Sequence, residues 1–195
     1  ALRASDPESL RATLGNIVAA AARMGSLVGQ LLALARAEPD AQRQHERRPL
    51  DLEQLARTVT ADWIPRALEA GIDLGFESPE QPLPIHGDAV MLRELIGNLV
   101  DNALKYCPRG SEVTVGVSAD AGGARLTVTD DGPGIPAAER DRVFERFHRL
   151  ADSSIPGNGL GLAIVREIAT SHGGRATVES GPDGRGTRVV VRVAA

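Results

Sequence analysis

Residues 98–106 read Asn-Leu-Val-Asp-Asn-Ala-Leu-Lys-Tyr, and this stretch indicates more than any other how the chain folds. Apolar residues recur around it at helical spacing, namely Leu92, Leu95, Ile96, Leu99 and Ala103. Steps of four, four and three residues place Glu94, Asn98, Asn102 and Lys105 on another face. Amide and carboxylate oxygens suit Mg²⁺, which usually binds through few protein groups and through phosphates. We therefore expect a metal–phosphate site on a helix that begins after Asp88, although a solvated polar face gives the same pattern.

Two glycine-rich stretches add a second signal. Asp130-Asp131-Gly132-Pro133-Gly134 directly follows an alternating strand. Its glycines let a flat ligand lie against bare backbone, and Asp130 can accept a hydrogen bond from an exocyclic amine, although the stretch also suits an ordinary turn. Residues 157–162, Gly-Asn-Gly-Leu-Gly-Leu, lead into an apolar helix whose first N–H groups can bind phosphate. They match neither a Walker loop nor a Rossmann fingerprint.

The composition is that of a globular chain with one main core. Of 195 residues, 42% are hydrophobic and 25% are charged, and the formal charge is −4. This balance gives no basic surface of the kind that nucleic acids need. Cys107 is the single cysteine, and no apolar run approaches the roughly 20 residues that cross a bilayer. We expect a cytoplasmic location, no nucleic-acid partner and no membrane contact by this chain.

The N-terminal part has a pattern of its own. From Leu10 to Ala35 the apolar residues recur with alternating steps of four and three, which predicts a helix over about residues 7–37 with a coiled-coil or four-helix-bundle partner. A surface helix packed on its own domain is the alternative. The polar residues that follow, 39–48, are typical of a linker. The predicted organisation is a partial dimerisation region at 1–38, a linker at 39–48 and a globular domain at 49–195.

Strands and helices of the globular part are interleaved in an order that favours a two-layer α/β sandwich over a doubly wound sheet. The patterns predict helices after Asp51 and after Asp88, and near residues 137–147 and 160–172. They predict strands near residues 72–76, 113–117, 126–128 and 189–193.

In order and character, these motifs resemble those of the sensor histidine kinases, members of a wider ATPase family that includes Hsp90 and MutL. Residues 98–106 resemble the N box, 130–134 the G1 box, 144–149 the F box and 157–162 the G2 box. Residues 184–187, Gly-Arg-Gly-Thr, resemble the closing glycine motif near the adenine, and suit a hairpin turn equally well. The resemblance implies a Bergerat ATP-binding fold, a mixed sheet under three helices, with ATP between the N-box helix and a lid at about residues 143–159.

The resemblance also implies a role for each matching residue. Asn98 and Asn102 would hold Mg²⁺, Lys105 and Arg149 the phosphates, Tyr106 the ring face and Asp130 the adenine amine, while Gly132 and Gly134 would floor the base pocket. The other implied ATP-binding residues are Ile135, Gly157, Gly159, Leu160, Gly161, Leu162 and Thr187. The implied catalytic residues are Asn98, Lys105 and Arg149, with Glu94 as a further candidate that also suits a solvated helix position.

Two aromatic positions and one histidine of the F box are less specific. Phe144 and Phe147 also suit core anchors of the lid hinge, and Phe144 suits that place better. His148 stands where the family often has Tyr, so the resemblance assigns it no role.

Asn98 separates a kinase from the hydrolases of the wider family. Hsp90-like and MutL-like ATPases carry at this place a Glu that activates water. Without that base, the site would position the γ-phosphate for a nucleophile supplied from outside, as a kinase requires.

The resemblance implies that the acceptor lies elsewhere. In the family it is a histidine on the first helix of a dimeric hairpin, and none of His45, His86, His148 and His172 has that context. We therefore expect the acceptor helix to precede Ala1, a homodimer through residues 1–38, a response regulator receiver domain as partner and a membrane-anchored parent protein. An anti-sigma-type serine kinase and an ATP-sensing dimerisation module without transfer activity remain as alternatives.

Overall fold

The computed structural model describes residues 47–150, 155 and 158–194. The predicted helix at 7–37, most of the linker and Gly157 lie outside these residues. Among the described residues, no helix is long and apolar enough to span a membrane.

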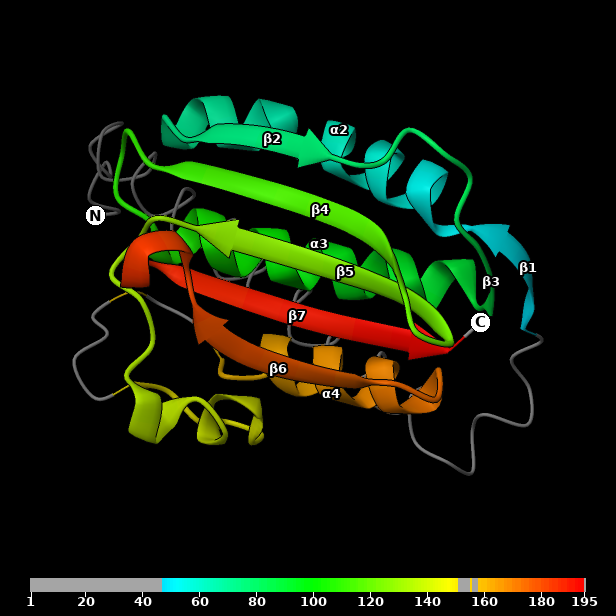
Figure 1. The fold of residues 1–195 in the computed structure, drawn as a ribbon. Coiled ribbons are helices and arrows are strands. Elements are labelled where there is room, and N and C mark those ends of the chain that lie inside the picture. Colours follow the sequence, from blue (N-terminus) through cyan, green and yellow to red (C-terminus); the bar gives the residue numbers. More distant parts are fainter. Residues whose placement is uncertain (1–46, 151–154, 156–157, 195) are drawn as a thin grey trace, which may run out of the picture.

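A five-stranded mixed sheet lies in front of three α-helices in Figure 1. The sheet has the order β2-β4-β5-β7-β6, in which β2 pairs parallel with β4 and the other neighbours are antiparallel. Its strands are β2 (Asp73–Glu77), β4 (Glu112–Asp120), β5 (Gly123–Asp130), β6 (Arg175–Ser180) and β7 (Thr187–Ala194). The helices are α2 (Leu52–Ala70), α3 (Ala89–Tyr106) and α4 (Gly161–Ser171). The predicted two-layer sandwich with a mixed sheet under three helices is confirmed for these residues.

Alternation along the central strands decides which side chains form the core. On β4, Val113, Val115 and Val117 are buried while the residues between them are not, and Ala124, Leu126 and Val128 alternate in the same way on β5. Leu95 and Ile96 of α3 are both fully buried behind the sheet. Burial of this apolar layer is the main source of stability, at roughly 25 cal/mol per Å² of apolar surface.

Aspartates begin the two long helices, as the sequence predicted. Oδ1 of Asp51 accepts from Glu53 N at 3.0 Å, and Oδ1 of Asp88 accepts from Val90 N at 2.8 Å. Helix α3 ends at Tyr106, two residues before Pro108, because proline cannot continue a helix. Residues 98–106 therefore form the C-terminal half of α3.

Several elements differ from the prediction. Residues 137–147 do not form an α-helix but two short 3₁₀ turns, η2 (Ala137–Glu139) and η3 (Arg142–Phe144). Only Val143 and Phe144 of this stretch are buried, so no apolar face holds a longer helix. The prediction missed the antiparallel pair β1 (Arg48–Asp51) and β3 (Pro84–Gly87), and also β6. β1 begins at the last residue that we assigned to the linker.

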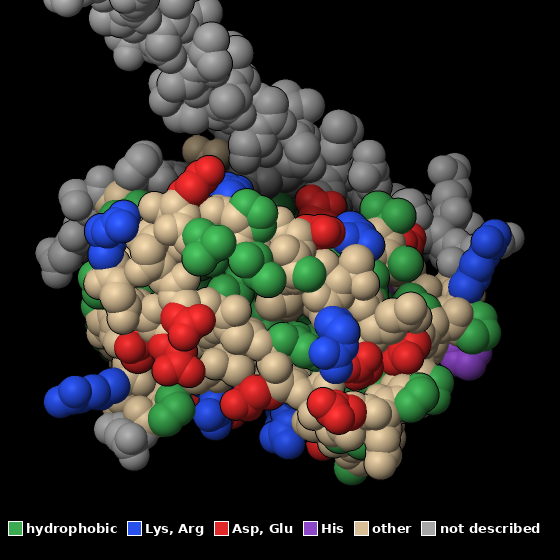
Figure 2. Space-filling model, turned by 90° about the horizontal axis from the view of Figure 1, so that it is seen from above, with side chains coloured by type: hydrophobic (Ala, Val, Ile, Leu, Met, Phe, Trp, Pro, Cys, Tyr) green, Lys and Arg blue, Asp and Glu red, His purple; other side chains and the backbone are tan. Residues whose placement is uncertain are grey.

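Charged and hydrophobic side chains share the outer side of α2 and the neighbouring edge strand β2. Figure 2 looks onto this side and shows acidic and basic side chains interspersed around small hydrophobic groups. One pair joins two helices, because Arg93 Nη1 of α3 lies 3.0 Å from Asp62 Oδ2 of α2. Both side chains are exposed, so this pair contributes little to stability.

A buried histidine ties the end of α4 to the beginning of α3. His172 is 3% exposed, and its Nε2 accepts the main-chain N–H of Asp88 at 3.1 Å. Its Nδ1 lies 2.8 Å from the carbonyl oxygen of Ile168, where it can act as donor. Burial lowers the pKa of His172 below its ordinary value of about 6.5. The neutral imidazole is therefore the form that the fold requires.

We expect His172 to make the fold sensitive to acid. Because its folded-state pKa is lowered, the unfolded chain takes up the proton first, and stability falls as pH drops below about 6.5. Urea unfolding between pH 7.5 and 5.5 should show this loss in the native sequence and a shallower pH dependence in His172→Gln. His86→Gln, which changes an exposed histidine on β3, serves as the control and should keep the native slope. Equal slopes in all three proteins would contradict the assignment.

Candidate functional site

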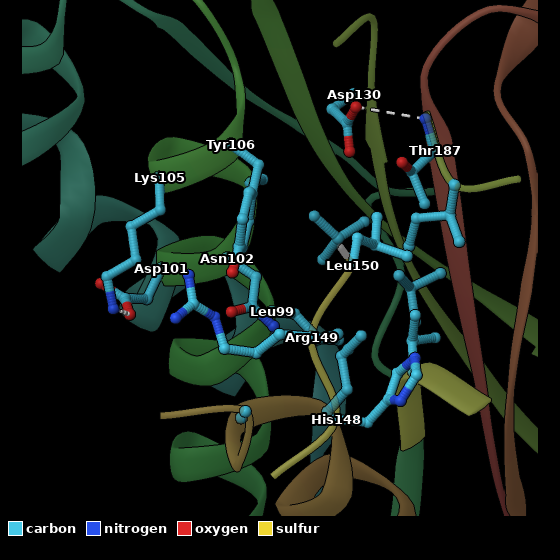
Figure 3. A pocket seen from close by; sticks show the side chains of 18 of the residues that line it. Leu99, Asp101, Asn102, Lys105, Tyr106, Asp130, His148, Arg149, Leu150 and Thr187 are labelled. Atoms are coloured by element: carbon cyan, nitrogen blue, oxygen red, sulfur yellow. Dashed lines mark hydrogen bonds and ion pairs between the residues drawn. The ribbon is translucent and has the colours of Figure 1, made fainter. Parts of the chain in front are cut away.

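One pocket brings together side chains from the C-terminal half of α3, the end of β5, the start of β7, the segment around residues 148–150 and the start of α4 (Figure 3). Most of the predicted ligand-binding residues line it: Asn102, Lys105, Tyr106, Asp130, Gly134, Ile135, Arg149, Gly159, Leu160, Gly161, Leu162 and Thr187. Residues that are far apart in the sequence therefore meet at one place, as the ordered motifs predicted.

Helix α3 supplies the polar wall of this pocket. Asn102, Lys105 and Tyr106 line it, whereas Asn98 lies one turn further back and does not. Asn98 Nδ2 donates to the carbonyl oxygen of Glu94 at 2.9 Å, which aims its Oδ1 away from that carbonyl. Glu94 itself is half-buried outside the pocket wall.

The start of α4 approaches the two asparagines of α3. A Cβ added to Gly161 would lie 3.2 Å from Asn102 Nδ2 and 3.4 Å from Asn98 Oδ1, so the absence of a side chain there allows the close approach. No side chain caps the start of α4. Because Gly161 and Leu162 line the pocket with Asn102, the positive end of the helix dipole lies at the pocket wall, an arrangement that suits an anion and its hydrated cation.

Asp130 forms the opposite end of the pocket, where β5 ends. Its Oδ1 accepts the main-chain N–H of Gly132 at 3.0 Å and that of Thr187 at 3.1 Å. Figure 3 shows the contact with Thr187. Burial raises the pKa of Asp130, against the lowering by these two donors. The carboxylate is thus held in one orientation and partly shielded from water, which strengthens any further hydrogen bond that it accepts.

Glycines allow the backbone to pack closely around Asp130. A Cβ on Gly132 would lie 2.9 Å from Cys107 Sγ, and Gly134 has a φ of +78° beside the carbonyl oxygen of Gly186. Gly134 lines the pocket, whereas Gly132 does not and instead donates its N–H to Asp130. Gly186 has a φ of +66°, and a Cβ there would collide with the carbonyl oxygen of Asp130. The stretch 184–187 therefore both turns the chain into β7 and completes this end of the pocket.

Residues 148–150 supply the third wall of the pocket. Arg149 lines the pocket, and Figure 3 shows its side chain pointing across the pocket toward Lys105 and Asp101 of α3. His148 also lines it, and its Nε2 lies 2.8 Å from Glu139 Oε2. His148 had been assigned no role from the sequence.

The two phenylalanines of this region have different environments. Phe144 is 4% exposed and packs in the core, so the core-anchor interpretation is confirmed for it. Phe147 is 67% exposed and has a φ of +65°, which is unusual for a residue with a side chain. Its N–H donates to the carbonyl oxygen of Gly159 at 2.8 Å, which joins residue 147 to the chain just before α4. Phe147 is not a core anchor.

The sequence interpretation missed several pocket residues. The apolar ones, such as Val128, Val143 and Leu150, gave no signal beyond the spacing of core residues. Asp101 did give a sequence signal, because it stands four residues before Lys105, which is the spacing of a helical ion pair.

Comparisons with known proteins show the family of this chain. The model of the histidine kinase-, DNA gyrase B- and HSP90-like ATPases matches residues 87–195. The sensor protein kinase PmrB of Pseudomonas aeruginosa is 35% identical over 192 residues, which cover 98% of this chain and 40% of PmrB. The chain therefore spans less than half of that relative.

Solved structures share the fold. Full-length ShkA in complex with AMPPNP matches with a TM-score of 0.79 and 31% identity, over 99% of this chain and 41% of that one. ThkA, crystallised with the response regulator protein TrrA, matches with a TM-score of 0.77 and 24% identity over 97% of this chain and 52% of that one.

Proposed function

Since the chain belongs to the family of histidine kinase-, DNA gyrase B- and HSP90-like ATPases, we propose that residues 49–195 bind MgATP and transfer its γ-phosphate to a histidine of a dimerisation hairpin. The observation that carries this proposal is the division of one pocket into two ends. Asp130 lies at one end, and Lys105, Arg149 and the start of α4 lie at the other. The two ends of the pocket match the two ends of a nucleotide. The base requires an oriented hydrogen-bond acceptor, and the phosphates require N–H groups and cations.

The proposal gives each of these groups a role toward the nucleotide. In the proposal, Asp130 accepts a hydrogen bond from the exocyclic amine of adenine, and Gly134, Ile135 and Thr187 contact the base. Gly132 supports Asp130 from behind instead of touching the base. Tyr106, which is 37% exposed, covers the ring face. The main-chain N–H groups of residues 159–162 hold the phosphate oxygens together with Lys105 and Arg149.

The two asparagines of α3 that lie beside the start of α4 suit a magnesium ion. The Oδ1 of Asn98 and the amide of Asn102 both lie beside Gly161, where neutral oxygen ligands and phosphate oxygens can share a hydrated cation. Bound Mg²⁺ would neutralise charge that develops on the phosphates during transfer. Asn98 and Asn102 are the proposed ligands.

Transfer to a protein acceptor is favoured over hydrolysis. Asn98 is an amide and cannot take a proton from water as a carboxylate does. Asn98, Lys105 and Arg149 are the proposed groups that position and stabilise the γ-phosphate. Glu94, which like Asn98 lies outside the pocket wall, is a further candidate. The response regulator as partner, the homodimer through residues 1–38 and the cytoplasmic location in a membrane-anchored parent rest on the sequence resemblance. ThkA was crystallised with such a regulator.

The function is tested by offering labelled MgATP and a separately prepared acceptor hairpin of a sensor kinase to this chain. We expect acid-labile label on the histidine of the hairpin. Acid-stable label on serine would identify a serine kinase instead. ATP binding without label on the hairpin would indicate an ATP-sensing module.

Asn102→Ala is expected to weaken ATP binding by about tenfold in the presence of Mg²⁺, because a metal ligand is removed. With EDTA in place of Mg²⁺, the native protein and the variant should bind ATP with similar affinity. Calorimetry of both proteins under both conditions measures this. A loss of the same size without Mg²⁺ would show that Asn102 contacts the nucleotide itself and not the metal.

A further inference from the structure

Asp101 is a carboxylate in the wall of a pocket that we propose for a polyanion. It stands on α3 between Asn98 and Asn102, four residues before Lys105, and it lines the pocket with Asn102 and Lys105. Its Oδ2 forms an ion pair with Lys105 Nζ, four residues on, and its Oδ1 lies 3.4 Å from Arg66 Nη2 of α2. The Asp101 side chain is 19% exposed, less than Lys105 at 39% and Arg66 at 61%. Asp101 is therefore the least exposed of these three side chains, and each of its carboxylate oxygens has a cation beside it.

Arg66 is itself held in place from α2. Its guanidinium lies 4.7 Å from the centre of the Trp63 ring, within the range of a cation–π contact. Trp63 in turn packs against α3 at Gly97, where an added Cβ would lie 3.7 Å from the indole. A chain of contacts thus runs from the packing of α2 on α3, through Arg66 and Asp101, to Lys105.

A negative charge at this place opposes ATP binding. The phosphates of ATP carry several negative charges, and Asp101 and Lys105 line the same wall. An uncharged residue at this position would favour ATP binding, so binding the nucleotide does not explain the carboxylate. Both of its oxygens already face protein cations, which leaves it poorly placed as a metal ligand.

We propose that Asp101 is a positioning residue that holds the Lys105 ammonium at the phosphate end of the pocket, with Arg66 as its support; this inference rests on the proposed function. A lysine has four rotatable side-chain bonds, and holding its ammonium in one place restricts their freedom before the nucleotide arrives. Alignment of charge at the γ-phosphate then speeds transfer, while the carboxylate lowers affinity for ATP.

The proposal predicts two effects of opposite sign in Asp101→Asn. Affinity for MgATP should rise about two- to fivefold, because a repulsive charge is removed. The rate of transfer to a separate acceptor hairpin, measured in a single turnover, should fall on the order of tenfold, because Lys105 is no longer held. Arg66→Ala should also slow transfer, by a smaller factor, but should not raise the affinity, because it removes a cation and leaves the carboxylate in place. In a double variant with Asp101→Asn it should add little to the loss of rate.

Lys105 offers a readout that does not depend on activity. It is the only lysine of the sequence, so protein grown with lysine labelled by ¹³C at the ε position gives one signal. That signal should move in Asp101→Asn and should move less in Arg66→Ala. Asp62→Asn is the matched control, because it removes the exposed ion pair with Arg93 between the same two helices, away from the pocket. It should change neither the signal, nor the affinity, nor the rate.

Each outcome decides the proposal. Tighter binding, slower transfer and a displaced Lys105 signal in Asp101→Asn support it. Weaker binding together with slower transfer would identify Asp101 as a ligand of the metal or nucleotide, and unchanged transfer would remove its positioning role; either result overturns the proposal. If the native chain transfers no phosphate at all, the proposed function fails. An unmoved Lys105 signal would then also overturn the contact itself.

Discussion

Asp130→Asn is expected to lower the affinity for MgATP by more than about tenfold, because a charge-assisted hydrogen bond to the base is worth on the order of 1.5–3 kcal/mol. The asparagine oxygen can still accept from Gly132 N and Thr187 N, as Oδ1 does now. The Nδ2 group then takes the place of the second carboxylate oxygen. A donor would face the donor amine of adenine, so the loss combines a missing bond with a repulsive contact.

The same geometry predicts a change of base preference. Inosine triphosphate carries a carbonyl where ATP carries the amine, and Nδ2 of the variant can donate to it. Calorimetry should therefore show that Asp130→Asn loses ATP affinity and gains affinity for inosine triphosphate relative to the native protein.

The neighbouring residue provides a control for charge alone. Asp131→Asn removes the same charge, but Asp131 accepts from Glu112 N at 3.0 Å and does not line the pocket. It should bind both nucleotides like the native protein. Equal effects of the two substitutions would show that Asp130 acts through its charge and not by contact with the base.

The second large effect is an absence of labelling. Incubated with labelled MgATP and no added acceptor, this 195-residue chain is expected to gain no stable phosphohistidine, whereas the added hairpin is labelled. In-line transfer requires a nucleophile held close to the γ-phosphate, and that alignment supplies much of the rate.

The described histidines are poorly placed as acceptors. His172 is buried with contacts at both ring nitrogens, and His86 lies on β3, at the end of the molecule opposite the C-terminal end of β5 (Figure 1). His148 lines the pocket, but its Nε2 faces Glu139. His45 lies outside the described residues. Acid-labile label on the chain alone, mapped by mass spectrometry to any of the four, would contradict the prediction, and His148→Gln would test the one that lines the pocket.

The parts of the fold that the sequence predicted are those with a strong local signal. Helix α3 has an aspartate cap, an apolar face and a proline shortly after its end. Each of these features acts on residues nearby in the sequence, so the sequence alone indicates the helix. The prediction of a helix over residues 137–147 was wrong, because too few residues of this stretch are buried to hold a helix against the core. β1 and β3 were missed because each contains a proline and is four residues long, so their pairing depends on contacts between distant segments.

The pocket was predictable to a similar degree. Residues in motifs, such as Asn102, Asp130 and Gly161, were named because these motifs resemble those of the sensor histidine kinases. The apolar wall was not, since Val128 and Leu150 look like any other core residue until the fold brings them together. Asn98 and Gly132 show a further limit, because the same motifs contain residues that line the pocket and residues that stand behind it.

The sheet ends on one side at β2, a five-residue strand with an acid at each end. Two copies that met edge to edge in antiparallel register would bring Asp73 opposite Glu77 twice, and both are exposed. Directly opposed like charges weaken strand pairing, and short charged edges are a common protection against uncontrolled growth of sheets between molecules. β2 therefore discourages fibril-like stacking of the domain at high concentration.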